Sequence, residues 1–331
     1  MKFLKPILIA WVILCSFSCE EDTSILGKPG EVLTVISKDY WESDLGQTLR
    51  DSLTAEYPML PQIEKRFDLT YVSPSGFTSM FQQHRNIIRL NIDMANRNEV
   101  VVRKNIWARP QCVIDIRAKS YNEAIDLIKK DSKLIINAIE DAERERLIDN
   151  NKEYASDVIN YEVQKLFNGS IEVPRDYRIM KQTHDFIWIA HNEEQSKRKN
   201  IIIYKYPVEK GVNMMDAESL IENNKEALKA NIPGMRENSY MIHSKHIKPT
   251  IQYLGYKDLQ FAEMRGLWDL ENDYMGGPFI AHVLYSPDGK YMVGVEGFVY
   301  APKYDKRQYL RQVESILYSY EWAEEETDEI K

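Results

Sequence analysis

The chain has 331 residues, a length that suits two domains rather than one. With 44% hydrophobic, 28% charged and 11% aromatic residues, it has the composition of a folded protein and not of a disordered one. The formal net charge of -8 argues against a nucleic-acid-binding surface, because neutralising phosphates requires clustered Lys and Arg.

The first 18 residues have the organisation of an export signal. Lys2 and Lys5 precede a short apolar run at residues 7–14. This run is too short for a membrane-spanning helix, which needs about 20 apolar residues. Cys19 directly follows a small residue, as in lipoprotein precursors. We therefore expect residues 1–18 to be a lipoprotein signal peptide and Cys19 to carry the lipid.

Ordinary secretion is the alternative, because Ser16 and Ser18 also fit the small-residue pattern of a secretory cleavage site. Lipid on Cys19 would instead hold the chain at a membrane, since acyl chains contribute about 0.8 kcal/mol per buried CH2 group. Residues 19–30 would then form a tether that leads to the first strand. We expect a lipid-anchored location in the cell envelope, at the outer membrane, with the periplasmic or surface face left open.

Cys112 has no expected disulfide partner if Cys19 carries lipid and Cys15 is removed with the signal. It lies in a strand-like alternating run, which favours a small buried hydrophobic residue over a reactive thiol. We expect packing rather than disulfides to stabilise the fold.

Residues 31–150 predict a first α+β unit. β-Branched runs bounded by turn residues indicate strands, and leucines at every fourth position, at 45, 49 and 53, indicate a helix. The expected strands are 31–37, 67–72, 86–92, 100–107 and 111–117, and the expected helices are 41–57, 75–84 and one that starts at Tyr121.

A highly charged stretch at residues 140–154 follows in that last helix. We interpret it as a solvated helical extension, with a bridge between domains as the alternative. Residues 151–170 are expected to be a helical connector, residues 171–322 a second α+β unit and residues 323–331 an acidic tail. The second unit has expected strands at 185–191, 200–207, 259–268, 279–285 and 291–300, a hairpin turn at 286–290, and helices at 216–230 and 305–322.

Three local similarities between the halves occur in the same order along the chain. Residues 85–88 are similar to residues 199–202, and residues 103–107 are similar to residues 265–268. The third similarity is between the helices that start near Tyr121 and Tyr304. Each match is short, but their shared order favours a duplication. We predict an α+β fold of two tandem, duplicated α/β sandwich units with mainly antiparallel sheets, joined by a long helical region.

The chain also resembles an uncharacterised family of Bacteroidota lipoproteins that carry a domain of unknown function. The resemblance covers essentially the whole chain after the signal. The motifs that carry it are residues 19–21, the Leu60-Pro61 pair before residues 67–70, residues 85–88 and residues 107–111. It implies an envelope location and a bacterial source, and it implies no activity.

Metal and cofactor motifs are weak. The sequence has no phosphate-binding glycine loop, no Gly-x-Ser-x-Gly and no His-Glu-x-x-His. His243 and His246 could share a metal, but the lysines at 245 and 248 disfavour a cation there. The alternating acids at 269, 271 and 273 are faintly like a calcium loop but lack the EF-hand spacing. We expect no catalytic residue, no metal site and no cofactor.

Two Arg and Trp pairs are candidates for ligand binding. Arg103 with Trp107, and Arg265 with Trp268, could each stack a guanidinium on an indole and offer planar donors to a carboxylate or a sugar. The favoured interpretation is structural, because Trp and Arg at strand ends more often cover the edge of a core.

The sequence favours a lipid-anchored envelope protein that binds a protein or glycan partner without catalysis. The partners expected are thus the membrane, through the lipid, and an envelope protein or glycan, and nucleic acid is not among them. The alternative is an envelope hydrolase or transferase whose site is assembled from distant residues.

Overall fold

The computed structural model describes residues 23–191 and 197–323. Its first unit contains a five-stranded sheet with the strand order β2-β1-β3-β5-β4. Three pairs in this sheet are parallel, and the edge pair β4–β5 is antiparallel. The strands are β1 (Glu31–Val35), β2 (Asp68–Val72), β3 (Asn86–Ile92), β4 (Glu99–Lys104) and β5 (Cys112–Ala118).

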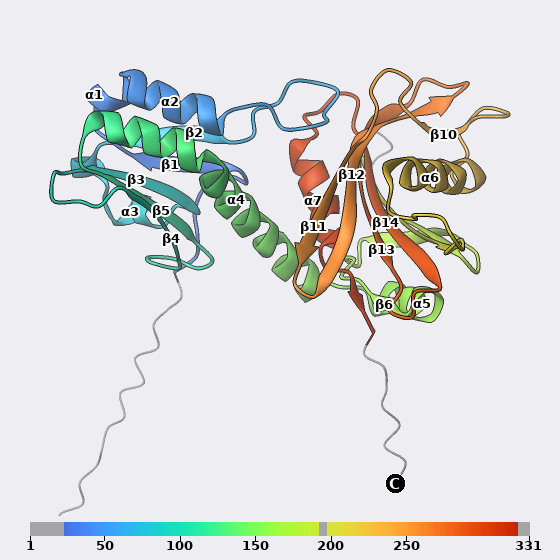
Figure 1. Ribbon diagram of the computed structural model, residues 1–331. Coiled ribbons are helices and arrows are strands. Elements are labelled where there is room, and N and C mark those ends of the chain that lie inside the picture. The colour runs from blue at the N-terminus through green and yellow to red at the C-terminus, as the bar shows by residue number, and fades with distance from the viewer. Residues whose placement is uncertain (1–22, 192–196, 324–331) are drawn as a thin grey trace, which may run out of the picture.

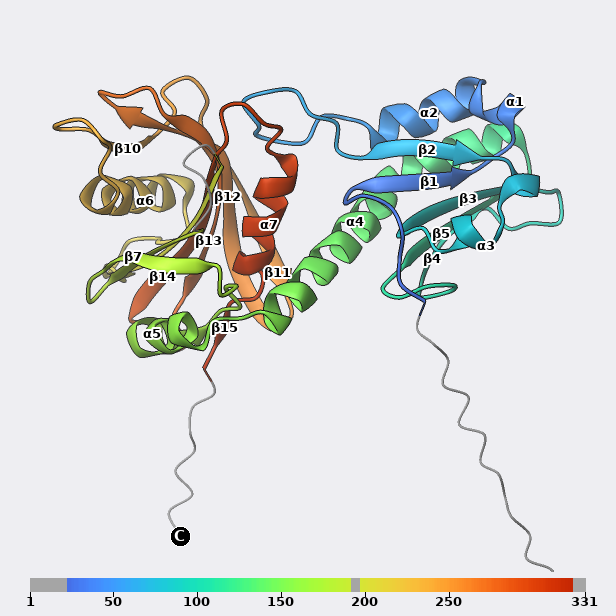
Figure 2. The ribbon, with the colours of Figure 1, turned by 180° about the vertical axis from the view of Figure 1, so that it is seen from behind.

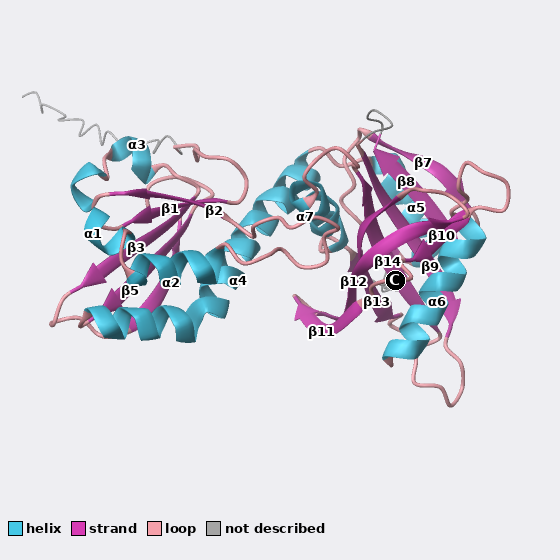
Figure 3. Cartoon of the chain, turned by 90° about the horizontal axis from the view of Figure 1, so that it is seen from above, coloured by secondary structure: helices cyan, strands magenta, loops and turns pink. Residues whose placement is uncertain are grey.

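Two helices cover one face of this sheet. α2 starts after Ser43, whose hydroxyl accepts a hydrogen bond from the Leu45 amide, and its evenly spaced leucines are buried. α4 packs beside α2, and the apolar cluster between these helices and the sheet includes Ile88 and Ile114. Figure 3 shows α2 and α4 on one side of the sheet and the short α3 on the other. The helices are α1 (Lys38–Trp41), α2 (Asp44–Leu53), α3 (Ser79–Gln82) and α4 (Tyr121–Glu153), with a 3-10 turn at Pro74–Gly76.

The second unit contains an eight-stranded antiparallel sheet that curls into a half-barrel (Figure 2). Its order is β10-β12-β13-β14-β9-β8-β7, and β11 pairs with β12. The strands are β7 (Tyr177–Gln182), β8 (Phe186–His191), β9 (Arg198–Pro207), β10 (Tyr240–His243), β11 (Thr250–Tyr256), β12 (Leu259–Glu271), β13 (Gly276–Tyr285) and β14 (Tyr291–Tyr300). The helices are α5 (Asp157–Phe167), α6 (Ala217–Asn231) and α7 (Arg307–Leu317), and β6 (Gly169–Ser170) pairs with β15 (Glu321–Trp322).

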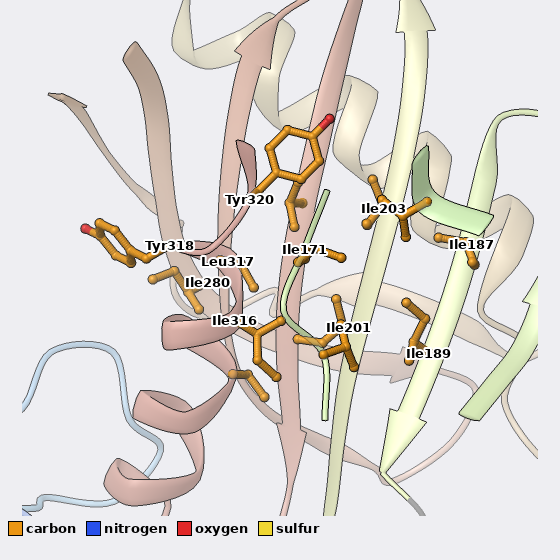
Figure 4. Packing of buried hydrophobic residues seen from close by; sticks show 14 of the residues in the cluster. Ile171, Ile187, Ile189, Ile201, Ile203, Ile280, Ile316, Leu317, Tyr318 and Tyr320 are labelled. Carbon is orange, nitrogen blue, oxygen red and sulfur yellow. The ribbon is translucent and has the colours of Figure 1, made fainter. Parts of the chain in front are cut away.

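Helices cover both faces of the half-barrel, which explains why its central strands are apolar on both sides. In β9, Ile201 and Ile203 face the core shared with α5 and α7, whereas Ile202 and Tyr204 face the core under α6. Figure 4 shows Ile201 and Ile203 beside Ile187 and Ile189 of the neighbouring strand.

The two units are joined by more than the covalent chain. α4 extends from the first unit to the second and contacts α7 (Figure 1). The Glu64 carboxylate, from the loop after α2, accepts hydrogen bonds from the amides of Lys306 and Arg307 at 2.6 and 2.9 Å. The first unit therefore caps the first turn of α7, which has no side-chain cap of its own.

The mixed α+β class and the mostly antiparallel pairing are confirmed, but the tandem duplication is not. Asn86 opens a strand with parallel neighbours on both sides, whereas Asn200 lies in a strand with antiparallel neighbours on both sides. The first sheet also differs from the expectation because it is mainly parallel. The short similarities between the halves thus reflect strand composition, which both kinds of sheet share.

Several expected elements also differ in extent. The expected strand 100–107 ends at Lys104, which leaves Trp107 in a loop, and the expected helix 75–84 is replaced by a 3-10 turn and the one-turn α3. The strands β7, β10 and β11 were not expected. The signal peptide, Cys19 and almost all of the acidic tail lie outside the described residues. In the described part of the chain, no helix is both long and apolar enough to cross a membrane.

Candidate binding cleft

A cleft with a cavity volume of 600 Å³ lies where the two units meet. The loop after α2 and helix α4 line one wall, and β11, β12 and α7 line the other. It is larger than the 490 Å³ cavity beside residues 267–277. Clefts between domains are a common place for ligand sites, which makes this cleft the first candidate.

A buried ion-pair network forms the floor of the cleft. Glu263 and Arg265 share one face of β12, because alternate residues of a strand point the same way. Arg265 Nε donates to Glu263 Oε1 at 2.6 Å, and Arg265 Nη2 donates to Glu314 Oε1 on α7 at 2.6 Å. Both carboxylates are buried, so the guanidinium is held in one orientation by two charged partners.

The first unit completes this network. The Tyr57 hydroxyl donates to Glu314 Oε2 at 3.1 Å, and Arg144 Nη2 on α4 lies 3.6 Å from Glu314 Oε1. The Arg144 guanidinium also lies 3.9 Å from the centre of the Tyr318 ring, within the range of a cation-π contact. Both units therefore contribute charged groups and aromatic rings to one site.

Opposing effects set the ionisation of the two carboxylates. Burial alone would raise the pKa of Glu314, but the charges of Arg265 and Arg144 outweigh burial and hold that pKa below its ordinary value. Burial also opposes ionisation of Glu263, yet Arg265 and His282 lower its pKa. Both carboxylates are thus ionised near neutral pH and act as hydrogen-bond acceptors.

The neighbouring groups are held in donor or neutral forms. Burial raises the pKa of Tyr318, and burial together with the Glu314 charge raises the pKa of Tyr57, so both phenols keep their protons. Burial lowers the pKa of His282 and keeps the imidazole neutral despite the nearby Glu263. The network therefore contains fixed donors and fixed acceptors at physiological pH.

Two buried guanidinium nitrogens at the cleft, Arg265 Nη1 and Arg144 Nε, have no hydrogen-bond partner among the described residues. A buried donor without an acceptor costs about 1 to 3 kcal/mol. Protein atoms cover both nitrogens, so they are unpaired donors within the wall of the cleft and not groups that a ligand contacts directly.

Comparison with known proteins identifies two sequence families. Residues 156–319 match the Domain of unknown function (DUF4837), and residues 25–152 match the Domain of unknown function (DUF8532). The chain carries two domains of unknown function. In the DUF8532 region lie Tyr57 and Arg144, and in the DUF4837 region lie Arg265 and Glu314. The cleft is therefore shared by the two family regions.

One solved structure, a crystal structure of a protein from Bacteroides thetaiotaomicron VPI-5482, is similar to part of the chain. Its sequence identity is 9%, the match covers 48% of this chain and 46% of that chain, and the TM-score is 0.30. The match thus spans about half of either protein. No curated protein matches the chain.

Of the second Arg and Trp pair, Arg265 lies in the cleft and Trp268 does not. The two side chains point to opposite faces of β12, so they do not form the stack that their spacing allowed. Trp268 is 2% exposed, its Nε1 donates to the Val299 carbonyl at 3.3 Å, and its ring packs against Phe298. Trp268 is a core residue of the DUF4837 region.

The first pair lies in the DUF8532 region, away from the cleft lining. Arg103 pairs with the Asp115 carboxylate, which also accepts a hydrogen bond from Arg89 Nε at 2.6 Å. The guanidinium over the Trp107 ring is that of Arg89, at 5.2 Å, and Phe77 meets the same ring edge-on at 5.4 Å. The guanidinium that stacks on Trp107 is thus that of Arg89 and not that of Arg103, the candidate from the sequence.

The sequence interpretation missed Tyr57, Arg144 and Glu314. One signal for Glu314 was present, because it shares the apolar face of its helix with Leu310 and Leu317 and an acid on such a face needs a buried partner. Arg144 lies in the charged stretch that was interpreted as solvated. No sequence pattern pairs it with a residue 170 positions later, so only the fold brings Arg144 and Glu314 together.

The histidine and acidic motifs do not form metal sites. His243 is buried and its Nε2 lies 2.5 Å from Asn224 Oδ1, whereas His246 is exposed. Glu271 pairs with Lys245 at 2.8 Å, and Asp273 lies 3.6 Å from Arg236. Within the described ranges, no group of three or more His, Cys, Asp or Glu side chains could hold a metal ion.

Proposed function

We propose that this protein is a lipid-anchored component of the cell envelope that binds a polar glycan in the cleft, without catalysing a reaction on it. The observation that carries the proposal is the fixed array of donors, acceptors and rings around Arg265 and Glu314. Sugar hydroxyls both donate and accept hydrogen bonds, so a site with ionised carboxylates beside guanidinium groups suits them.

The mixture of charges favours a glycan over a polyanion. The cleft is lined by Arg66, Arg144 and Arg265, but also by five acidic side chains, at positions 140, 141, 145, 263 and 314. The lining therefore carries more negative than positive charge, which disfavours a strongly anionic ligand. Tyr256 and Tyr318 add rings on which the apolar face of a sugar can pack.

The ionisation states in the cleft support binding rather than catalysis. A general acid or base works best with a pKa near the operating pH. The Glu263 and Glu314 pKa values are shifted down and the Tyr57 pKa is shifted up, so each moves away from neutrality. The carboxylates thus act as acceptors and not as proton donors.

Oligosaccharide binding tests the cleft. Asn137 and Gln252 line it and are exposed, so the double variant Asn137→Ala with Gln252→Ala removes two polar groups without emptying the core. Against soluble peptidoglycan fragments and neutral envelope oligosaccharides, calorimetry should give a Kd at least about fivefold weaker, because each lost hydrogen bond contributes about 0.5 to 1.5 kcal/mol.

Gln260→Ala is the matched control, because Gln260 is exposed on β12 and outside the cleft lining. It should leave the Kd unchanged. The proposal fails if none of these oligosaccharides binds the wild-type protein, or if the double variant binds as tightly as the control.

The lipid anchor has its own test at Cys19. Cys19→Ser should release the chain from the membrane fraction, because lipid on Cys19 is the proposed anchor. Fractionation after a high-salt wash measures this release, and intact mass measures the acyl chains. A serine variant that stays in the membrane fraction would contradict the anchor.

A further inference from the structure

The first described residues of the chain are hydrogen-bonded to the first unit. The Thr23 carbonyl accepts a hydrogen bond from the Arg109 amide at 3.0 Å, and Ser24 forms a parallel bridge with Arg109. The Leu26 amide donates to the Gln83 carbonyl at 2.8 Å. The backbone is therefore fixed to the first unit from Thr23 onward.

Four residue steps separate Cys19 from Thr23. A fully extended chain spans at most about 3.6 Å per residue, so Cys19 lies within about 14 Å of Thr23. This length is less than half the thickness of a bilayer core, about 30 Å. A lipid on Cys19 therefore brings the part of the first unit around Thr23 to the membrane surface.

We propose that this part of the first unit, which we name the tether edge, docks on the phospholipid bilayer. The proposal rests on the lipidation of Cys19 stated above. The tether edge consists of the segment that begins at Thr23, residues 77–84 around α3, and the loop 104–111 after β4. Gln111 joins the last two segments, because its Nε2 donates to the Gln82 carbonyl at 2.6 Å.

The side chains of the tether edge suit a membrane interface. Leu26, Met80 and Ile106 are large apolar residues with exposed fractions of 45%, 62% and 40%. Transfer of such surface from water is favourable by about 25 cal/mol per Å². The same edge thus holds the tether and three exposed apolar side chains.

The opposite edge of the sheet provides an internal control. β3 starts at the tether edge with Asn86 and ends at Ile92, and Met94 follows in the next turn. A seven-residue strand is about 23 Å long, so Met94 is held far from the lipid when the tether edge is docked. Met94 is 88% exposed and so is as open to labelling as Ile106.

Fluorescence quenching in vesicles tests the docking. The acylated full chain, with Cys112→Ala to remove the buried thiol, is reconstituted into vesicles of phosphatidylethanolamine and phosphatidylglycerol with brominated acyl chains. A fluorophore is attached through Ile106→Cys or, as the control, through Met94→Cys. We expect the fluorescence of the label at position 106 to fall at least twofold. The fluorescence of the label at position 94 should fall by less than a tenth.

A charge substitution on the same surface separates lipid contact from mere proximity. Met80→Asp should reduce the quenching at position 106 by at least half, because a carboxylate disfavours insertion among acyl chains. Leu134→Asp is the matched control, since Leu134 is exposed on α4, outside the tether edge. An unchanged signal in the Met80→Asp variant would overturn the apolar contact.

Failure of docking can be distinguished from failure of lipidation. If Cys19 carries no lipid, the mass lacks acyl chains and the protein does not float with the vesicles. If the acylated protein floats but the label at position 106 is unquenched, or is quenched no more than the label at position 94, the docking proposal is wrong.

Discussion

At the residue scale, one buried carboxyl group with a strongly raised pKa lies outside the cleft. Glu296 of β14 is fully buried under α6, and burial raises its pKa to about 8 despite a 2.5 Å hydrogen bond from Asn224 Nδ2. Asn224 Oδ1 contacts His243, whose pKa is lowered by burial to about 4. The folded protein thus keeps a protonated acid and a neutral imidazole as the two partners of the Asn224 side-chain amide.

These shifts predict a pH dependence of stability. The folded state keeps the Glu296 proton that the unfolded chain releases above its ordinary pKa of 4.5, so raising the pH to about 8 destabilises the fold. His243 has the opposite effect on stability. Between about pH 4 and 6.5 its imidazole is protonated in the unfolded chain but neutral in the fold, so raising the pH stabilises the fold. The contributions of Glu296 and His243 to the pH dependence cancel from about pH 4.5 to 6.5. Above pH 6.5 only the destabilising contribution of Glu296 remains.

We therefore expect the free energy of unfolding to fall by roughly 2 kcal/mol between pH 6.5 and 8, at about 1.4 kcal/mol per pH unit. Glu296→Gln should remove this slope, because the amide does not titrate. Urea denaturation at each pH measures it. Glu222→Gln, on the exposed face of α6, should keep the slope. An equal slope in the Glu296 variant would show that its proton is not linked to folding.

The two tryptophans of the sequence-predicted pairs should differ in their contribution to stability. Trp268 is 2% exposed and packs in the half-barrel core, so Trp268→Ala should cost about 3 to 5 kcal/mol. Trp107 is only partly buried, so Trp107→Ala should cost clearly less. Chemical denaturation of both variants measures the difference. Equal losses would contradict the different burial of the two rings.

At the element scale, α7 depends on a group from the other unit. The Glu64 carboxylate accepts hydrogen bonds from the first two amides at the start of this helix, and α7 packs on the half-barrel. Glu64→Ala should lower the free energy of unfolding by about 0.5 to 2 kcal/mol, the usual cost of a lost helix cap. Thermal unfolding measures this. Glu56→Ala, an exposed acid of the same loop, should be neutral.

Local sequence patterns predicted the elements that have a regular apolar period. The leucines of α2 and the hairpin of β13 and β14 were readable because their neighbours in space are neighbours in sequence. The parallel pairing of β1 with β3 was not, since it depends on contacts across about fifty residues. β11 was missed because it is an edge strand with mostly exposed residues and no apolar alternation.

At the scale of the whole molecule, the cleft network also joins the two units. Glu314 of the second unit accepts from Tyr57 of the first and lies near Arg144 of α4. The sequence named one member of this site, Arg265, but as a possible stacking partner of Trp268 and with a structural role favoured. The partners on α4 and in the loop after α2 could not be predicted, since the arrangement of the two units brings them together.

Because Glu314 balances two guanidinium groups, we expect Glu314→Gln to weaken the joint between the units. Removing one member of a buried ion pair typically costs about 3 to 5 kcal/mol, since the remaining charges stay desolvated. Tyr57 loses a charged acceptor in the same variant. Calorimetry should therefore show a single transition for the wild-type protein and two separated transitions for Glu314→Gln.

Glu218→Gln is the control for this variant, because Glu218 is exposed on α6 and remote from the joint. It should keep one transition with an unchanged Tm. If Glu314→Gln also unfolds in one transition with the wild-type Tm, the network does not join the units. If the Tm falls but the transition stays single, the network stabilises the two units as one cooperative body, joined also by Glu64 and α7.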